Sequence, residues 1–404
     1  MRVSIKPGVA RGTITAPPSK SMAHRLLISA AMADGVSKVR GISDCEDVRA
    51  TLDCMSALGV EYTVEDDTVT VHGRNPKDAA PQKPLYARES GSTLRFFIPI
   101  ALLSGRTTMF VGAGRLMSRP MSVYEDICRE RKMAFIADGE SITVRGPLKG
   151  GCFNVVGNIS SQFISGLLFA LPSLDEDSRI RIAPPIESRS YIDMTIAALR
   201  TFGVEAAWEN EYTIFVRGGQ RYRATDVRVE GDYSGAAFPE ALNVLGGDVR
   251  VEGLNPESIQ GDKIYAKHYA RLAEGLPTIH IGDCPDLGPI LFAVAAARCG
   301  GVFSGTKRLK IKESDRAAAM AEELGKLGTS LTVYDDKVVV YPKELHSPSE
   351  PIKAHGDHRI VMSMAILLTL VGGEIEGAEA VSKSYPAFFH DLRSLGIEVT
   401  EYEA

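Results

Sequence analysis

Short polar stretches that precede apolar runs recur along this 404-residue chain, and three of the six carry basic side chains. Six such stretches read SKSMAHR (19–25), ESGSTLR (89–95), ISSQF (159–163), DYSGAA (232–237), CPDLGP (284–289) and DHR (357–359). Each would open a helix, and a helix N-terminus attracts phosphate or carboxylate because its first N–H groups are unsatisfied and its dipole is positive there. Together the six stretches predict a site for a small polyanion.

Eight cations at the expected boundaries between elements stand out because the chain carries a formal net charge of −5. They are Lys20, Arg25, Arg95, Arg119, Lys312, Arg316, Arg359 and Lys383. A single Lys or Arg beside a serine is usually a solvated cap, but so many together favour an anion site. Asp286 and Glu313 are the carboxylates expected to face them, although either could be a simple cap or ion-pair partner. Gly91 fits close approach of the backbone to a ligand, or a tight turn.

The composition excludes several classes of protein. With 44% hydrophobic and 24% charged residues the chain is globular rather than disordered. Its six cysteines are scattered, without Cys-x-x-Cys or zinc-ligand spacing, which predicts reduced thiols in the cytoplasm and no metal site. The N-terminus lacks a signal-peptide run, and the longest apolar runs are shorter than the roughly 20 residues of a membrane helix. Neither a membrane nor a nucleic-acid partner is expected.

The elements that position these residues form a repeat that occurs six times. Apolar helices are expected to begin near His24, Ser92, Ser161, Ser234, Leu287 and His358. A second, amphipathic helix and a hairpin with a polar turn follow, as in residues 47–73. Each repeat therefore reads as strand, helix, strand, helix and hairpin. We expect the first helices to be buried all round and the second set to cover the outside.

The length and the six repeats predict two domains of three repeats each. The chain is expected to leave the first domain near Pro18 and to return after Arg228. The first domain would thus comprise residues 1–18 plus 229–404, and the second residues 19–228. The short interval before Leu287 predicts that the fourth repeat has lost part of its hairpin.

Ten short motifs resemble, in order and over essentially the full length, the signatures of the enolpyruvyl transferase family. They read PPSKSMAHR (17–25), SGSTLRF (90–96), SRPM (118–121), SSQF (160–163), SRSYID (188–193), EGDYS (230–234), PD (285–286), KESDR (312–316), DHR (357–359) and SKSYP (382–386). The match is to the members whose acceptor is shikimate 3-phosphate. The resemblance implies an α/β fold, a two-domain inside-out α/β barrel built from six βαβαββ-type repeats.

The resemblance also implies which residues bind the substrates. Shikimate 3-phosphate would be held by Lys20, Ser21, Arg25, Ser160, Ser161, Gln162, Ser188, Tyr191, Asp286 and Lys312. Phosphoenolpyruvate would be held by Lys20, Gly91, Arg119, Gln162, Arg316, Arg359 and Lys383. Such a division suits the donor, since phosphoenolpyruvate carries a carboxylate and a phosphate and needs several cationic hydrogen-bond donors.

The implied reaction transfers the enolpyruvyl group to the 5-hydroxyl of the acceptor in the shikimate pathway of aromatic amino acid biosynthesis. The hydroxyl attacks the middle carbon of phosphoenolpyruvate while the methylene gains a proton, and elimination then expels phosphate. Asp286 is the candidate base for the hydroxyl. Glu313 and Lys383 are candidates for proton transfer at the methylene, and Lys20 completes the catalytic set. The resemblance implies no metal, no cofactor and a monomer.

Two residues depart from the family pattern, and two rival functions stay open. Glu89 and Arg308 stand where many relatives carry Asn, so no contact is carried over to them. Transferases that act on UDP-N-acetylglucosamine usually have a cysteine in the loop before the Arg-Pro pair, and residues 112–120 contain none. That favours shikimate 3-phosphate. A non-catalytic protein that binds anions or nucleic acid would need the cations but neither Asp286 nor Glu313.

Overall fold

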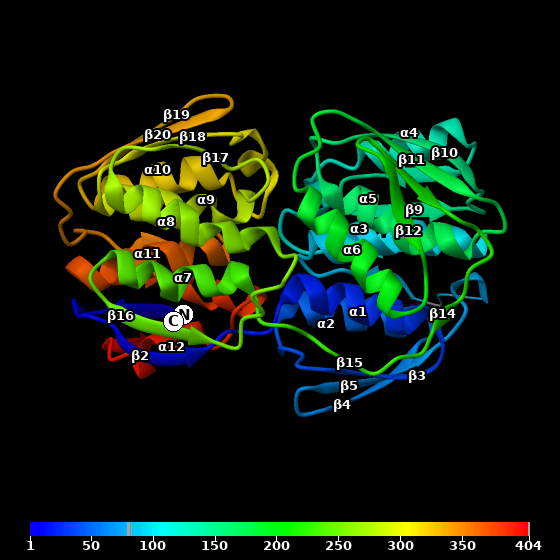
Figure 1. Ribbon diagram of the computed structural model, residues 1–404, viewed down its shortest axis with the longest axis horizontal. Helices are drawn as coiled ribbons and strands as arrows, with labels where there is room; N and C mark the ends of the chain where they lie inside the picture. Colours follow the sequence, from blue (N-terminus) through cyan, green and yellow to red (C-terminus); the bar gives the residue numbers. More distant parts are fainter. Residues whose placement is uncertain (79–80, 82, 403–404) are drawn as a thin grey trace. The chain divides into compact units, whose positions relative to one another are not determined.

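The computed structural model describes residues 1–78, 81 and 83–402 (Figure 1). It divides into two compact units: unit 1 comprises Met1–Ser19 and Gly231–Ala404, and unit 2 comprises Lys20–Glu230. The boundaries expected from the sequence fall next to these positions, and their standing as independent domains stays a prediction. Among the described residues, no helix has both the length and the apolar character needed to cross a membrane.

The three sheets of unit 2 share one plan, in which an edge strand runs parallel to its neighbour and the other main pairings are antiparallel. The first has the order β14 (Tyr222–Arg223), β3 (Ala33–Arg40), β5 (Thr68–Gly73), β4 (Glu61–Glu65), and β15 (Val227–Arg228) also pairs with β3. The second has the order β6 (Leu85–Tyr86), β7 (Thr107–Val111), β9 (Ser141–Arg145), β8 (Ala134–Ala137). The third has the order β10 (Gly151–Val156), β11 (Ser178–Ala183), β13 (Thr213–Val216), β12 (Ala206–Asn210).

Unit 1 repeats the plan twice. One sheet has the order β17 (Thr278–His280), β18 (Gly301–Ser304), β20 (Lys337–Tyr341), β19 (Ser330–Val333). The other has the order β21 (Ile352–Lys353), β22 (Gly373–Glu376), β1 (Arg2–Ile5), β23 (Val399–Tyr402), so both ends of the chain lie in one sheet. The remaining sheet is the parallel pair β2 (Arg11–Thr15) and β16 (Asp248–Glu252).

The fourth repeat lacks its hairpin. After β16 the chain forms α8 (Tyr265–Glu274) and passes directly to β17, with no strand among the described residues between them. The short interval before Leu287 predicted a shortened hairpin, and the structure has neither of its strands among the described residues of this repeat.

One set of helices is apolar and buried. It comprises α1 (Lys20–Met32), α3 (Gly91–Ala101) and α5 (Ser161–Ala170) in unit 2, and α7 (Tyr233–Val244), α9 (Gly288–Ala297) and α11 (His358–Val371) in unit 1. Along α3, ten of the eleven side chains are buried, because Leu94 through Ala101 are apolar on every face of the helix except at Arg95. α1 begins four residues before the expected position, so Lys20 and Ser21 lie in its first turn.

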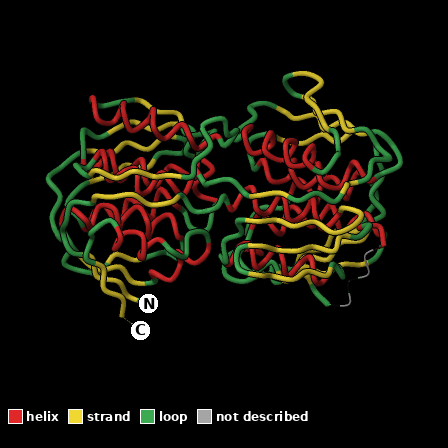
Figure 2. The backbone as a smooth tube through the Cα atoms, turned by 60° about the horizontal axis from the view of Figure 1, so that its bottom comes forward, coloured by secondary structure: helices red, strands yellow, loops and turns green. Residues whose placement is uncertain are grey.

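The second set of helices is amphipathic. It comprises α2 (Glu46–Ala57), α4 (Ser122–Glu130), α6 (Arg189–Thr201), α8, α10 (Arg316–Lys326) and α12 (Phe388–Ser394). We expected these helices to cover the outside of the molecule, but they do not form the outer layer by themselves. The sheets lie outside the helices in each unit (Figure 2). Buried and exposed residues alternate along their strands, as in β11. A half-buried antiparallel sheet can face water, so the hairpins cover the helices.

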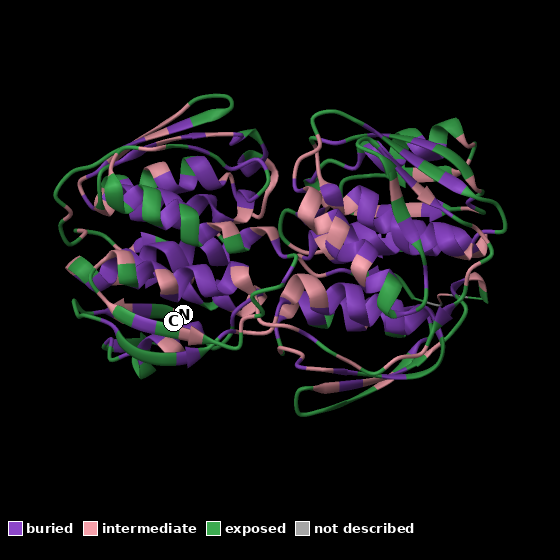
Figure 3. Ribbon diagram, viewed as in Figure 1, coloured by how far each residue is buried: buried purple, intermediate pink, exposed green. Residues whose placement is uncertain are grey.

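Short 3-10 turns connect many of these elements. They are η1 (Pro76–Asp78), η2 (Leu102–Ser104), η3 (Leu116–Ser118), η4 (Leu171–Ser173), η5 (Gly261–Ile264), η6 (Pro285–Leu287), η7 (Lys307–Ile311) and η8 (Ala378–Lys383). Each unit has its own hydrophobic core, which the central helices dominate (Figure 3). The polar starts of those helices are therefore held on rigid, buried elements.

Candidate active site

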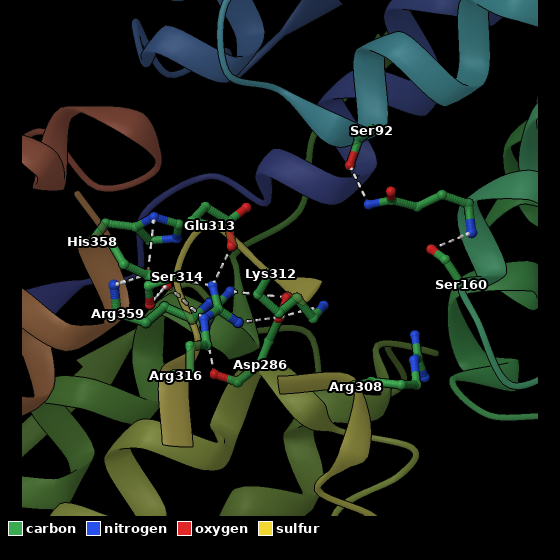
Figure 4. A network of polar contacts seen from close by, with 12 residues as sticks. Ser92, Ser160, Asp286, Arg308, Lys312, Glu313, Ser314, Arg316, His358 and Arg359 are labelled. Atoms are coloured by element: carbon green, nitrogen blue, oxygen red, sulfur yellow. Dashed lines mark hydrogen bonds and ion pairs between the residues drawn. The ribbon is translucent and has the colours of Figure 1, made fainter. Parts of the chain in front are cut away.

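Three helix starts in unit 1 bring one group of expected site residues together (Figure 4). Asp286 lies in η6 directly before α9, Arg316 is the first residue of α10, and Arg359 lies in the first turn of α11. Lys312 follows η7, at the entry to α10. Residues up to 73 positions apart in the sequence thus lie together in one cluster of charged side chains.

The Asp286 carboxylate is the centre of this cluster. Its Oδ1 lies 3.1 Å from Lys312 Nζ and 2.8 Å from Arg316 Nη1. Its Oδ2 lies 3.2 Å from Arg359 Nη2, and Arg359 Nη1 also donates to the Asp286 carbonyl oxygen at 2.9 Å. Asp286 is therefore no simple helix cap, because three cations from three elements converge on it.

A second carboxylate, Asp357, holds the same guanidinium from the opposite side. Arg316 Nε donates to Asp357 Oδ2 at 2.8 Å, and Ser314 Oγ donates to the same oxygen at 3.0 Å. Asp357 also accepts the backbone N–H of Arg359 at 3.0 Å, which makes it the N-cap of α11. Its side chain is fully buried, so these contacts satisfy it in place of water.

Charge and burial compete in setting the pKa values of this cluster. Burial by itself raises the pKa of the Asp286 carboxyl, but Arg359, Lys312 and Arg316 outweigh it and hold that pKa well below its usual range. Burial likewise opposes ionisation of Asp357, and Arg316 lowers its pKa below the ordinary value. Burial lowers the pKa of the Lys312 ammonium, although Asp286 acts in the other direction. Both carboxyl groups are thus ionised at neutral pH.

The other expected residues of unit 1 lie near this cluster or point elsewhere. Glu313 Oε2 accepts from Arg316 Nη2 at 2.8 Å. Lys383 Nζ donates to the Gly356 carbonyl at 2.6 Å, one residue before Asp357. Arg308, one of the two departures from the family pattern, is buried, and its Nη1 lies 3.3 Å from the Gly282 carbonyl.

A second group of expected residues lies in unit 2. Lys20 Nζ forms a salt bridge of 2.7 Å with Asp47, a residue in the first turn of α2. Arg25 is buried, and it joins α1 to α6 by donating to Thr195 Oγ1 at 2.8 Å and to the Tyr191 carbonyl at 2.9 Å. Burial lowers the Arg25 pKa to about 10, so its guanidinium stays charged at neutral pH. Arg25 Nη1 also donates a hydrogen bond of 2.6 Å to the Ser21 carbonyl.

The starts of α3 and α5 meet through side chains. Arg95 Nη1 donates to Gln162 Oε1 at 2.7 Å, and Gln162 Nε2 donates to Ser92 Oγ at 2.8 Å. Ser160 is the N-cap of α5, and its Oγ accepts from the backbone N–H of Gln162 at 3.3 Å. Ser161 is the first residue of that helix and is buried. Gln162 is therefore already oriented by both neighbours.

Gly91 makes room for guanidinium groups. A Cβ added there would lie 2.8 Å from Arg119 Nη1 and 3.1 Å from Arg95 Nη1, closer than real Cβ atoms approach or pack comfortably. Its φ is not in the left-handed region, because Gly91 is the first residue of α3 and is absent from the glycines with positive φ. The tight-turn interpretation of Gly91 is therefore wrong.

The remaining sequence-predicted residues of unit 2 lie at the start of α6. Ser188 precedes α6 with a left-handed φ of 57°, and Tyr191 lies in its first turn. Glu89, the second departure from the family pattern, precedes the N-cap Ser90, and its carboxylate would lie 2.9 to 3.1 Å from a Cβ added at Gly114.

Sequence reasoning assigned no role to several residues that organise these two groups. Asp47 pairs with Lys20, Asp357 anchors Arg316 and is itself held by Ser314, and Thr195 anchors Arg25. A signal existed only for Asp357, because an Asp directly before a helical apolar run is a preferred N-cap. The others are distant from their partners in sequence, by 27 residues for Lys20 and Asp47 and by 170 residues for Arg25 and Thr195.

One group of potential metal ligands occurs among the described residues: Glu322, Glu323 and His355, whose ligand atoms lie within 4.8 Å of one another. The buried Glu323 carboxylate is already paired at 2.7 Å with both Lys326 and His355, and it accepts the Lys353 backbone N–H at 3.0 Å. Ion pairing within unit 1 explains this cluster, and no metal role is assigned to it.

Comparison with known proteins decides the family of this chain. The family model described as EPSP synthase (3-phosphoshikimate 1-carboxyvinyltransferase) matches residues 6–392. The chain belongs to the EPSP synthase family. Its activity is enolpyruvyl transfer from phosphoenolpyruvate to shikimate 3-phosphate in the shikimate pathway. The resemblance noted in the sequence predicted this family and this reaction correctly.

Individual EPSP synthases are similar over nearly their whole length. The 3-phosphoshikimate 1-carboxyvinyltransferase of Clostridium perfringens strain ATCC 13124 is 40% identical over 420 residues, covering 98% of each chain. That of Clostridium beijerinckii is also 40% identical and covers 98% of this chain and 97% of its own. A solved EPSP synthase from Acinetobacter baumannii superposes with a TM-score of 0.76 at 26% identity, covering 99% of this chain. A second structure from that species, with a TM-score of 0.77 at 24% identity, supports the fold alone. The expected two-domain inside-out α/β fold is confirmed.

Proposed function

We propose that the two groups of side chains bind the two substrates and carry out the transfer by addition and elimination. Shikimate 3-phosphate would be held by Lys20, Ser21, Arg25, Ser160, Ser161, Gln162, Ser188, Tyr191, Asp286 and Lys312. Phosphoenolpyruvate would be held by Lys20, Gly91, Arg119, Gln162, Arg316, Arg359 and Lys383. The observation that carries the proposal is the convergence of Lys312, Arg316 and Arg359 on the Asp286 carboxylate.

Phosphate binding in unit 2 is supported by the start of α5. Ser160 is its N-cap and Ser161 its first residue, so two serine side chains lie at the N-terminal end of the helix, the end at which anions bind. The positive end of the helix dipole favours an anion there. Nearby, Arg95 orients the Gln162 amide by donating a hydrogen bond of 2.7 Å to its oxygen.

The acid and base roles rest on the carboxylates of unit 1. Asp286 is partly exposed and ionised at neutral pH, so its carboxylate is in the form that accepts the proton of the attacking hydroxyl. The three cations that lower its pKa also weaken it as a base, so its proposed role requires the substrates to draw those cations away. Glu313 and Lys383, with Lys20 from unit 2, are the groups proposed for the proton that enters and leaves the methylene carbon. The cations that bind the phosphate of phosphoenolpyruvate also stabilise its charge as it departs.

We further propose a monomeric protein of the cytoplasm that binds small-molecule substrates and no nucleic acid. The cytoplasmic location is supported by the cysteines, since all six are free thiols and a reducing compartment keeps them so. The absence of a nucleic-acid partner is supported by the net charge of −5.

The acceptor is tested by phosphate release from phosphoenolpyruvate with two alternative substrates. The purified full-length chain should release phosphate with shikimate 3-phosphate and not with UDP-N-acetylglucosamine. Turnover with the nucleotide sugar alone would overturn the assigned acceptor. Phosphoenolpyruvate binding without turnover, at saturating shikimate 3-phosphate, would favour a non-catalytic binding protein.

A further inference from the structure

The Arg316 guanidinium has almost no hydrogen-bond donor left for a substrate. Its side chain is 1% exposed, and an arginine offers five N–H donors in a fixed plane. Nε donates to Asp357, Nη1 donates to Asp286, and Nη2 donates to Glu313, each at 2.8 Å. Nη2 also lies 3.4 Å from Asp357 Oδ1, so its second N–H faces that carboxylate. One N–H on Nη1 is therefore all that these contacts leave.

A substrate carboxylate needs more than one donor from Arg316. The strong contact between arginine and a carboxylate uses two parallel N–H groups, which a single remaining N–H cannot supply. At least one of the three protein carboxylates must therefore withdraw before Arg316 can bind a ligand in this way.

Burial indicates which carboxylates can withdraw. The Asp357 side chain is 0% exposed, accepts from Ser314 Oγ and caps α11. If it moved away from Arg316, its own negative charge would stay buried without a cationic partner, which is costly. The side chains of Asp286 and Glu313 are 21% and 17% exposed, and water can solvate them once they turn away. Asp357 is thus a fixed anchor, whereas Asp286 and Glu313 are exchangeable partners.

We propose that Asp286 and Glu313 act as stand-in anions that occupy Arg316 until the carboxylate of phosphoenolpyruvate displaces at least one of them. The inference rests on the proposed role of Arg316 in binding this substrate. It links donor binding to catalysis, because the carboxylates displaced are the two that are proposed to move protons. The exchange also lowers the affinity for phosphoenolpyruvate, because the incoming carboxylate competes with a protein carboxylate for the same N–H groups.

The exchange predicts that removing a site carboxylate strengthens substrate binding. We expect Glu313→Gln to bind phosphoenolpyruvate, titrated alone by calorimetry or by NMR line shifts, about tenfold more tightly than the unsubstituted chain. A neutral amide competes less, since hydrogen bonds between charged partners are roughly twice as strong as neutral ones. Asp286→Asn should act in the same direction, and it carries the test if Glu313→Gln does not fold.

A matched control separates exchange from a general effect of charge. Asp315→Asn removes one negative charge two residues from Glu313. Asp315 caps α10 by accepting from the Ala318 N–H, and its side chain forms no hydrogen bond or ion pair with Arg316 among the described residues. Asn is an equally good N-cap, so the fold should be kept. Its affinity for phosphoenolpyruvate should change far less than that of Glu313→Gln.

Three results would overturn the exchange: unchanged or weaker binding in both carboxylate variants, an equal gain in Asp315→Asn, or no measurable binding in any of the chains. The proposed function fails independently of it. Phosphate release by the unsubstituted chain with both substrates, together with unchanged affinity in the variants, would exclude the exchange and leave the proposed function intact. Tighter binding without any turnover would do the reverse.

Discussion

Asp286→Asn is expected to lower turnover by roughly 10²–10⁴-fold, the contribution typical of a positioned general base. The substitution keeps the size of the side chain and one acceptor oxygen but removes its basicity. Shikimate 3-phosphate should still bind, because its phosphate is proposed to be held by Ser160, Ser161 and Lys312. Steady-state rates and a calorimetric affinity for the acceptor measure both effects.

The same experiment distinguishes the possible roles of Asp286. Near-full turnover in Asp286→Asn would show that another group is the base, with Glu313 and Lys383 as the next candidates. Loss of acceptor binding would make Asp286 a positioning residue first. A thermal melt of the variant is needed as well, since Lys312, Arg316 and Arg359 all lose their shared charged partner.

Arg316→Met should destabilise the protein by about 3–5 kcal/mol, as expected when one partner of a buried ion pair is removed. The cost arises because the fully buried Asp357 would lose its guanidinium partner and keep Ser314, the backbone N–H of Arg359 and the more distant His358 ring, whose Nδ1 is 3.9 Å from Oδ1. The free energy of unfolding in urea measures the effect. Arg250→Met is the control, since Arg250 is 77% exposed and its pairing with Glu252 is worth about 1 kcal/mol or less.

The pH dependence of this difference has a definite sign. Arg316 lowers the pKa of Asp357 in the folded chain, so the pair contributes stability above the unfolded value of about 3.9 and loses it as the pH falls through the folded value. Without Arg316, burial dominates and Asp357 can take up a proton. The difference in the free energy of unfolding between the unsubstituted chain and Arg316→Met should therefore narrow as the pH falls toward about 4. A cost below about 1 kcal/mol at neutral pH would contradict the anchoring role.

The sequence predicted the scaffold better than the contacts. Polar residues before apolar runs located the helix starts, because an apolar helix must be buried and its N-terminus must be capped. Ser160 and Asp357 occupy those caps. The apolar run from His24 placed the start of α1 four residues too late, since the first turn from Lys20 is polar and carries none of the apolar periodicity on which the expectation depended.

The pairing of charges could not be predicted, because tertiary packing decides it. Lys20 was expected to bind substrate, and nothing in the sequence linked it to Asp47. Arg316 was likewise expected to bind the donor, whereas the fold surrounds it with Asp286, Glu313 and Asp357. Sequence identifies residue types suited to an anion site. Only the arrangement of the helix starts shows which of those residues pair with one another.

The fate of solvent hydrogen tests addition and elimination most directly. The chain should be mixed with phosphoenolpyruvate and shikimate 3-phosphate in heavy water, and the methylene group of the product should be examined by NMR. Addition places a solvent deuteron on the methylene carbon, and elimination then removes one of the hydrogens of the resulting methyl group. The account predicts that deuterium appears in the product methylene. A product that forms at full rate without any deuterium there would contradict the mechanism.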